Sequence, residues 1–186
     1  MKVNYKIEML SDWHIGSGLD SGADADALVL KDENNLPFIP GKTIKGLFKD
    51  ALNEIADVQS DIVKEEDIFH VFGGKKNDTS TEKGNAYFAN AVLPEKEKKE
   101  IISNELSRQL YRNIASTRID KKGVAVKNSL RTIEVCIPVV LEGEIIVQRE
   151  EDVELLKKAF KWTRHIGVGR NRGLGRCHID YINTEN

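Results

Sequence analysis

Residues 152–182 decide the fold of this chain, and they read Asp152-Val-Glu-Leu-Leu-Lys-Lys-Ala-Phe-Lys-Trp-Thr-Arg-His-Ile-Gly-Val-Gly-Arg-Asn-Arg-Gly-Leu-Gly-Arg-Cys-His-Ile-Asp-Tyr-Ile182. The apolar residues recur at helical spacing over residues 152–165, which predicts an amphipathic helix. Residues 177–182 have the apolar content of a strand. A glycine-rich run separates the two segments. We therefore predict a helix, a tight loop and a closing strand.

The loop combines four glycines with three arginines. Glycine lacks a Cβ, so it allows tight turns and lets backbone amides approach a bound group. Arginine carries a planar, permanently charged fork that suits phosphate oxygens. These residues are Gly167, Gly169, Gly173, Gly175, Arg170, Arg172 and Arg176. We predict that the loop contacts an anionic backbone, and the alternative is a tight turn with solvated arginines.

Two other glycine-rich phosphate motifs do not match this run. A dinucleotide fingerprint requires a third glycine at the position of Arg172, and a following helix that residues 177–182 do not provide. A P-loop requires Gly-Lys followed by Ser or Thr, which is absent from the run. A loop for RNA phosphates is the interpretation that remains.

The rest of the chain also shows patterns that are typical of strands and of helices. Alternating apolar residues predict a half-buried strand over Lys2–Leu10, and helical spacing predicts a helix over Lys42–Val58. Further strands are expected over Asn85–Leu93 and Glu134–Gln148, the latter with a bend at Leu141-Glu-Gly143. The resulting order βαββαβ predicts an α+β, ferredoxin-like fold, which RNA-recognition (RRM-like) modules share.

Several inserted segments are expected within a single domain of residues 1–186. The polar and glycine-containing residues 59–84 predict a mobile loop region. Residues 94–132 form an insertion, beginning with a surface helix over Glu95–Asn113. Its second part, Thr117–Thr132, is basic and is expected to form a protruding hairpin or loop.

The distribution of charge is more informative than its total. With 28 Lys and Arg against 30 Asp and Glu, the formal net charge is only −2. Yet residues 157–176 contain seven basic residues and no acid, and residues 118–131 contain five basic residues and one acid. Such segregation is typical of a protein with one basic face, and it favours a nucleic-acid partner.

The cysteines and histidines indicate neither a disulfide nor a metal cage. Cys136 and Cys177 both lie in apolar, strand-like runs, so we expect buried, reduced thiols. The histidines lack neighbours at ligand spacing, so no dedicated metal cage is predicted. The sequence shows no apolar signal region at its start and no stretch that could span a membrane. We therefore expect a cytoplasmic protein without a membrane partner.

The start of the first predicted helix is a second candidate phosphate site. Thr43 is expected to cap the helix, and Lys42, Lys45 and Lys49 lie along one flank. The alternative is a capped helix with solvated lysines. His14, after the first strand, is either a structural hydrogen-bonding residue, an RNA contact or a general acid or base.

Acidic residues in the segments after the first strand are a further candidate site. They are Asp20, Asp24, Asp26 and Asp32. Turn formation alone accounts for such residues. A carboxylate facing RNA could also orient a 2′-hydroxyl or hold a Mg²⁺ ion with mostly water ligands.

Taken together, four segments resemble the RAMP superfamily of CRISPR-associated proteins. They are His14-Ile-Gly-Ser-Gly18, residues 26–46 ending in Pro-Gly-Lys-Thr-Ile-Lys-Gly46, Phe72-Gly73, and the glycine-rich run Gly167–Gly175. More narrowly, the chain is similar to the repeating backbone subunit of type III (Csm/Cmr) RNA-targeting effector complexes.

The resemblance implies partners and contact residues. Copies of the chain would stack along a CRISPR guide RNA together with other subunits of the complex. The first-helix lysines and the glycine loop would hold the guide, and the thumb-like segment Thr117–Glu134 would wedge between guide–target base pairs. The thumb residues expected at RNA are Arg118, Lys127 and Arg131.

The resemblance also implies a reaction, antiviral cleavage of target RNA. In such subunits an aspartate after the first strand cleaves the target with Mg²⁺ or another divalent cation. The matching position is Asp26, with Asp24 as the alternative register. Three rival hypotheses stay open: a non-catalytic RNA-binding scaffold, a guide-processing ribonuclease that uses His14, and a ferredoxin-like interaction module without an RNA role.

Overall fold

A four-stranded antiparallel sheet forms the centre of the protein. The computed structural model describes residues 1–18, 25–77 and 80–182. The sheet has the order β4-β7-β1-β8, with β1 Lys2–Met9, β4 Tyr87–Phe88, β7 Val140–Ile146 and β8 Cys177–Ile182. The two helices that connect these strands complete the order βαββαβ, so the predicted ferredoxin-like α+β fold is confirmed.

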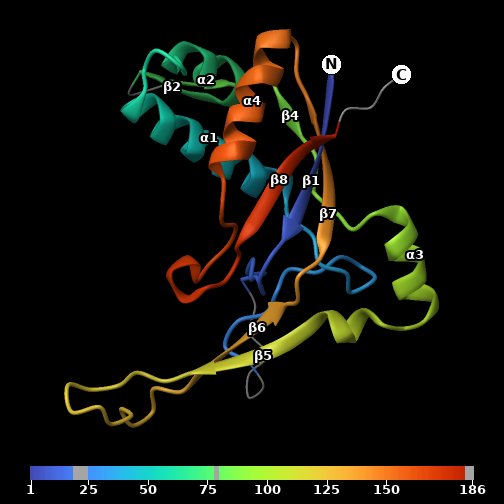
Figure 1. Ribbon diagram of the computed structural model, residues 1–186, viewed down its shortest axis with the longest axis vertical. Coiled ribbons are helices and arrows are strands. Elements are labelled where there is room, and N and C mark those ends of the chain that lie inside the picture. The colour runs from blue at the N-terminus through green and yellow to red at the C-terminus, as the bar shows by residue number, and fades with distance from the viewer. Residues whose placement is uncertain (19–24, 78–79, 183–186) are drawn as a thin grey trace.

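Helices α1 (Gly41–Val58) and α4 (Glu150–Trp162) pack together on one face of this sheet (Figure 1). The alternate residues of β1, including Tyr5, are buried under them, as the period-two pattern predicts. The ring centroid of Tyr5 lies 5.9 Å from that of Phe48 and 5.3 Å from that of Phe160. This aromatic contact joins one residue from each of the three elements and fixes both helices on the sheet.

Residues 59–84 are more regular than the expected loop. They contain helix α2 (Glu65–Phe72) and a hairpin of β2 (Gly73–Asn77) and β3 (Ser80–Lys83). The hairpin begins where Gly73, with φ of 69°, ends the helix. A Cβ on Gly73 would lie 2.4 Å from the carbonyl oxygen of Glu82, so only glycine fits this crossing.

The expected strand over residues 85–93 is much shorter in the structure. Only Tyr87–Phe88 pairs as a strand, and the chain then makes single bridges between Ile39 and Ala91 and between Val92 and Glu142. Phe88 and Ala91 are buried, so the expected core position is correct although the strand is not continuous.

The predicted protruding hairpin is confirmed, and its stem starts earlier than expected. Strands β5 (Tyr111–Ser116) and β6 (Arg131–Cys136) pair over their whole length, and the hairpin extends away from the body (Figure 1). We call residues 111–136 the thumb. The helix expected over residues 95–113 ends early, as α3 (Glu95–Ser103), and is followed by the 3-10 turn η1 (Ser107–Leu110).

The long strand expected over residues 134–148 is divided, but at a different point. The break lies at residues 137–139, between β6 and β7, where Pro138 has no amide hydrogen to donate to a ladder. The expected bend at residues 141–143 was wrong, because these residues lie inside β7. The break separates the thumb from the central sheet.

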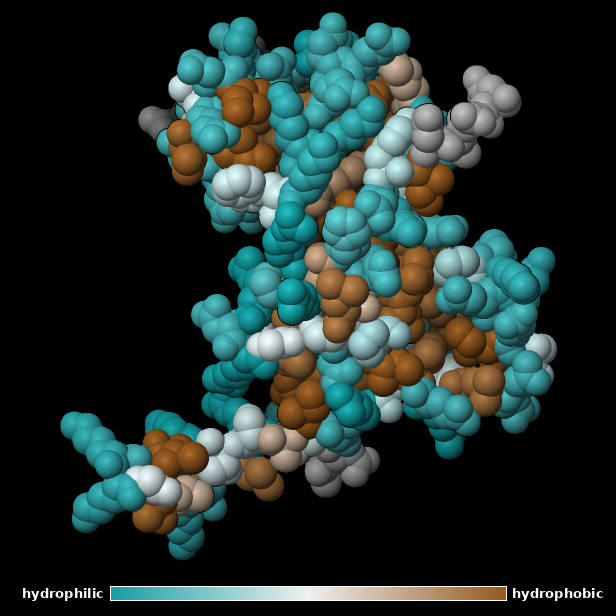
Figure 2. Space-filling view, in the orientation of Figure 1, coloured by the Kyte–Doolittle hydropathy of each residue, from teal (hydrophilic) through white to brown (hydrophobic). Residues whose placement is uncertain are grey.

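Side chains of different polarity occupy different parts of the surface. Hydrophilic side chains cover α4 and the region of the loop before β8, whereas apolar ones gather between the sheet and α3 and at the thumb's tip (Figure 2). Cys136 and Cys177 are buried and unpaired, as predicted. Among the described helices, none combines the length and the apolar content needed to cross a membrane.

Candidate nucleic-acid interface

The glycine loop, residues 166–176, is shaped by left-handed backbone conformations. Gly167, Gly169, Gly173 and Gly175 all have positive φ, between 72° and 84°. A Cβ on Gly167 would lie 2.2 Å from the carbonyl oxygen of His14, and one on Gly175 would lie 1.9 Å from that of Ile166. Gly167 and Gly175 therefore cannot carry a side chain, because the backbone of another segment lies too close to each of them.

Most of the loop's amides bond within the protein. Val168 donates to the carbonyl of His14 at 3.1 Å, Gly175 to that of Asp12 at 2.7 Å, and Arg172 to that of Gly169 at 2.8 Å. These amides cannot serve a phosphate, contrary to the expectation that the glycines expose the backbone. The loop's contribution to anion binding rests on its arginine side chains, and Arg170, Arg172 and Arg176 are exposed.

The start of α1 is fixed by a distant residue. The side-chain oxygen of Asn90 accepts a hydrogen bond from the amide of Gly41 at 2.9 Å, and no side chain of the helix start caps it. The predicted cap by Thr43 is therefore wrong. A Cβ on Gly41 would lie 2.0 Å from the carbonyl oxygen of Phe88, which explains the glycine after Pro40. Helix α1 thus begins directly against β4.

The glycine loop and the start of α1 share one cleft, which we call the helix cleft. It has a volume of about 710 Å³. Lys42 and Thr43 line it from α1, and Arg164, Gly167 and Arg170 line it from the opposite side. The two candidate phosphate sites, the glycine loop and the helix start, therefore lie beside each other. The same cleft contains acidic residues of α1 farther along the helix, namely Asp50, Glu54 and Asp57.

The three lysines of α1 do not share this location. Lys42 alone lines the helix cleft. Lys49 donates from Nζ to the carbonyl of Gly73 at 2.6 Å and lines a different hollow beside β2. Lys45 is partly exposed and lines neither cavity. Since Lys49 holds the β2–β3 hairpin against α1, the expected RNA role of Lys49 is not supported by its contacts.

A second hollow, of about 650 Å³, lies between the thumb and the glycine loop. Arg118, Lys127 and Arg131 line it from the thumb, and Arg172 lines it from the loop. We call it the thumb hollow. In the described part of the chain, none of these four basic side chains takes part in an ion pair. Their charges are therefore available to a ligand.

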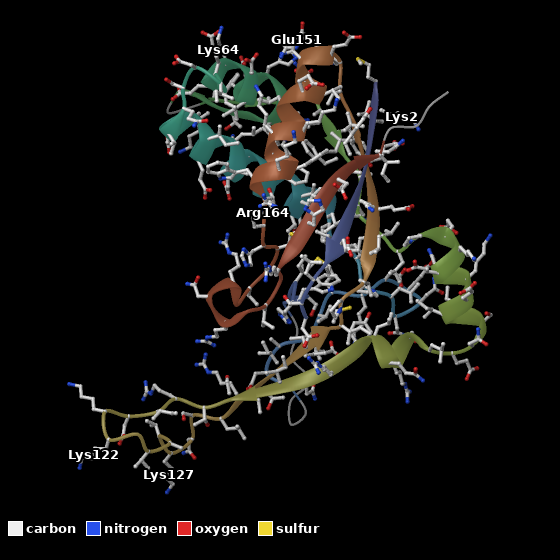
Figure 3. The ribbon with its side chains drawn as sticks, viewed as in Figure 1. Lys2, Lys64, Lys122, Lys127, Glu151 and Arg164 are labelled. Carbon is white, nitrogen blue, oxygen red and sulfur yellow. The ribbon has the colours of Figure 1, made fainter. Side chains whose placement is uncertain are left out.

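The two cavities together define a basic track from α1 to the thumb. Arg170 lines the helix cleft, and Arg172, two residues later, lines the thumb hollow. Figure 3 places Arg164 at the lower end of α4 and Lys122 and Lys127 at the far end of the thumb. The glycine loop lies between these two places in the same view. The basic track thus runs from Lys42, across the loop, to Lys127.

His14 is a buried structural residue rather than a surface contact. Its side chain is 4% exposed, and Nδ1 lies 2.6 Å from the carbonyl oxygen of Glu134 in the thumb. Because a carbonyl can only accept, Nδ1 carries the hydrogen. The expected direct contact with RNA, and the expected acid–base role, do not fit this burial. His14 instead joins β6 to the glycine loop through the bond from Val168.

Two neighbours of His14 that the sequence pattern did not reveal complete this connection. The backbone of Trp13 exchanges hydrogen bonds with that of Cys136 at 2.9 and 2.8 Å. The carboxylate of Asp12 accepts hydrogen bonds from the guanidinium of Arg112 in β5, one of them from Nε at 2.7 Å. Residues 12–14 therefore connect the thumb to the glycine loop. The only sign of this role in the sequence was the position of the tripeptide directly after the first strand.

A second set of bonds fixes the thumb's base. The carboxylate of Glu134 accepts from the amide of Val29 at 3.0 Å and from Nζ of Lys31 at 2.8 Å. Lys31 also lies 3.9 Å from the centroid of the Tyr111 ring. Burial, and then nearby negative groups that include Glu134, raise the pKa of the Tyr111 hydroxyl. Tyr111 therefore stays a neutral donor, and it bonds to the carbonyl of Asn35 at 2.8 Å.

Asp26 lies at the same base, on the surface. Its Oδ2 accepts from the amide of Thr132 at 2.7 Å, and its own amide donates to the carbonyl of Thr132 at 2.7 Å. The residue is exposed. The described residues contain no group of three or more His, Cys, Asp or Glu side chains that could hold a metal ion. A single exposed carboxylate can supply one ligand to a cation whose other ligands are water. Asp20 and Asp24 lie outside the described residues.

The fold and this surface define a ferredoxin-like protein with a protruding thumb and a basic track. A family model of the RAMP superfamily matches residues 6–178. This chain therefore belongs to the RAMP superfamily. No curated protein matches the sequence.

Solved structures share the fold at low identity. One is a chain of a "Cryo-EM structure of the Type III-B Cmr-beta bound to cognate target RNA", with a TM-score of 0.73 and 12% identity over 97% of both chains. Another is a chain of the "Type III-B Cmr-beta Cryo-EM structure of the Apo state", with a TM-score of 0.73 and 13% identity. That match covers 99% of this chain and 98% of the other.

Proposed function

We propose that this protein is a guide-RNA-binding backbone subunit of a type III CRISPR effector complex. The observation that carries the proposal is the basic track, in which Arg170 and Arg172 face two different cavities from one short turn. A ribose-phosphate strand passing over the glycine loop would meet Lys42 and Arg170 on one side and Arg172 on the other. Similarity to chains of the Cmr-beta complex supports the assignment.

The thumb supports a second part of the role, contact with the paired guide and target. The part of the thumb beyond its paired strands carries three exposed apolar side chains, Ile119, Val124 and Leu130, which are 63%, 61% and 68% exposed. Apolar side chains of this kind enter between stacked bases, while flanking cations hold the phosphates. Arg118, Lys127 and Arg131 are those cations here. We propose that the thumb separates base pairs of the guide–target duplex.

We further propose that Asp26 takes part in cleavage of the target RNA. The carboxylate lies where the thumb leaves the body, and the amide of Thr132 holds Oδ2 in place. A strand splayed by the thumb would pass this oxygen pair. A divalent cation bound there would polarise the phosphate at the cut. The scaffold hypothesis keeps the same RNA contacts without cleavage, and Asp26 is the residue that distinguishes the two.

The RNA-binding role is tested by salt-dependent binding of single-stranded RNA to the full-length protein. Arg172→Gln is expected to weaken binding and to lower the slope of log K against log salt by about 1, the loss of one phosphate contact. Lys99→Gln on α3, an exposed lysine away from the track, is the matched control and should leave the slope unchanged. Equal slopes for both variants, or RNA binding that ignores salt, would contradict the proposal.

A further inference from the structure

The helix cleft contains an exposed aromatic ring that the basic track does not use. Trp162 is the last residue of α4 and is 45% exposed, whereas Trp13 is fully buried. The indole Nε1 donates to the Glu54 carboxylate at 2.8 Å, so the ring is held by its edge. A ring fixed in this way, beside a basic surface, is a platform on which a nucleobase can stack.

The charges of the helix cleft are divided along its length. Lys42 and Glu54 are twelve residues apart on α1, which places them about 18 Å apart along the helix axis. The cationic end holds Lys42 and Arg170, and the other end holds Glu54 and Asp57. A phosphate is repelled by the acidic end. Groups with N–H donors are attracted to it, and the edges of nucleobases are such groups.

Glu54 keeps accepting capacity after its bond to Trp162. An ionised carboxylate has two oxygens and about four lone-pair sites, and the indole occupies one of them. Two adjacent N–H donors on a planar edge make the strongest match to a carboxylate, because they form two parallel bonds. Among the RNA bases, guanine presents such a pair, N1–H and the 2-amino group, on its Watson–Crick edge. The other bases present a single donor group there.

We propose that the helix cleft holds one unstacked guanine of the bound RNA. Its ring stacks on Trp162, its Watson–Crick edge donates to Glu54, and its phosphate lies toward Arg164, two residues beyond the tryptophan. This inference rests on the proposed RNA-binding function and adds a base preference to a surface otherwise suited to backbone contacts. A basic protein segment is a poorer match for the cleft than an RNA base. Such a segment would fit only the acidic end, because Lys42, Arg164 and Arg170 would repel it from the rest of the cleft.

The test compares short RNAs that differ in one base. The full-length protein is titrated with fluorescein-labelled oligouridylates that carry a central guanosine, inosine or uridine. Inosine lacks the 2-amino group, so its RNA should bind about tenfold more weakly than the guanosine RNA. Unlabelled guanosine RNA should also quench tryptophan fluorescence, and the quenching reports Trp162 because Trp13 is buried.

Two variants distinguish the contribution of the Trp162 ring from that of the Glu54 carboxylate. Trp162→Leu should remove the guanosine preference and the quenching, while Glu54→Gln, which keeps a side-chain oxygen for the indole, should remove the preference and keep the quenching. Glu151→Gln, at the other end of α4 (Figure 3), is the control and should behave as the wild type. Equal binding of guanosine and inosine RNAs by the wild type, with tight binding retained, overturns this inference and leaves the proposed function intact.

Two other experimental outcomes would have different meanings. Failure of every oligouridylate to bind would overturn the proposed function itself, and with it the guanine site. If the guanosine preference is absent and the wild type instead binds a lysine-rich peptide that Glu54→Gln fails to bind, the cleft is a protein-docking site, and the inference is wrong.

Discussion

The carboxylate of Asp12 accepts a hydrogen bond from Nε of Arg112 at 2.7 Å, while the carbonyl of Asp12 accepts one from the amide of Gly175. One residue therefore holds both the stem of the thumb and the end of the glycine loop. Asp12 is only 8% exposed, so removal of Arg112 would leave a buried carboxylate without its ion-pair partner.

Removal of the partner should loosen the thumb before it unfolds the domain. Arg112→Ala is expected to lower the free energy of unfolding by about 1 kcal/mol, a small value because the arginine side chain is 63% exposed. Amide exchange in β5 and β6 should rise more than in β1. Arg108→Ala on η1, which removes an exposed arginine nearby, is the control. Unchanged exchange in the thumb would show that the ion pair does not hold it.

The glycines of the loop should differ in their tolerance of a side chain. Gly175→Ala is expected to destabilise the protein by about 3 kcal/mol or more, because its Cβ would lie 1.9 Å from the carbonyl oxygen of Ile166 and its φ is 72°. Gly173→Ala meets the same backbone penalty without a clash, so about 1 kcal/mol is expected. Urea denaturation of both variants measures the difference. Equal losses would mean that the conformation, rather than the close approach, selects Gly175.

The elements that the sequence predicted well have local causes. Alternation along β1 and helical spacing along α1 and α4 are set within each segment, and the structure confirms them. The glycine loop follows α4, and α4 packs beside α1 as in the ferredoxin-like order, so the loop and the start of α1 line one cleft.

The predictions that failed concern contacts between distant residues. Asn90 caps α1 from 49 positions away, and His14 bonds to Glu134 across 120 positions. Lys49 turns to the carbonyl of Gly73, which the spacing of lysines on one flank cannot reveal. Charge and residue type identified candidates for the basic track, but tertiary packing decided which of them remain free to bind a ligand.

Asp26 should be needed for cleavage through its charge, not through its bond to Thr132. Asp26→Asn retains an oxygen that can accept from the Thr132 amide, whereas Asp26→Ala removes both the charge and the bond. If the carboxylate acts with a divalent cation, both variants should lose target cleavage by about a hundredfold or more in the assembled complex. Guide binding should persist. Cleavage restored by Asn would assign Asp26 to positioning the thumb, and cleavage unaffected in both would support the scaffold hypothesis.

The two buried thiols provide a measure of folding that is independent of RNA. Burial raises the pKa of Cys136 to about 12 and that of Cys177 to about 12, from the ordinary thiol value of 9.0. The thiolate is the reactive form, so neither residue should be alkylated at pH 8 unless the protein unfolds. As the pH rises from about 9 to about 12, the unfolded chain loses thiol protons that the folded chain retains. The free energy of unfolding should therefore fall over this range, by up to about 1.4 kcal/mol per pH unit for each cysteine.

Comparison with a double Cys→Ser variant isolates the contribution of these thiols. Urea denaturation at several pH values between 8 and 9.5, where the lysines are still mostly charged, should give a steeper loss of stability for the wild type than for the variant. The sign is fixed by the direction of the shift, since a raised pKa makes the folded state the one that holds the proton. Parallel curves, or iodoacetamide labelling of Cys136 in the folded protein, would show that the base of the thumb opens to solvent far more often than its packing indicates.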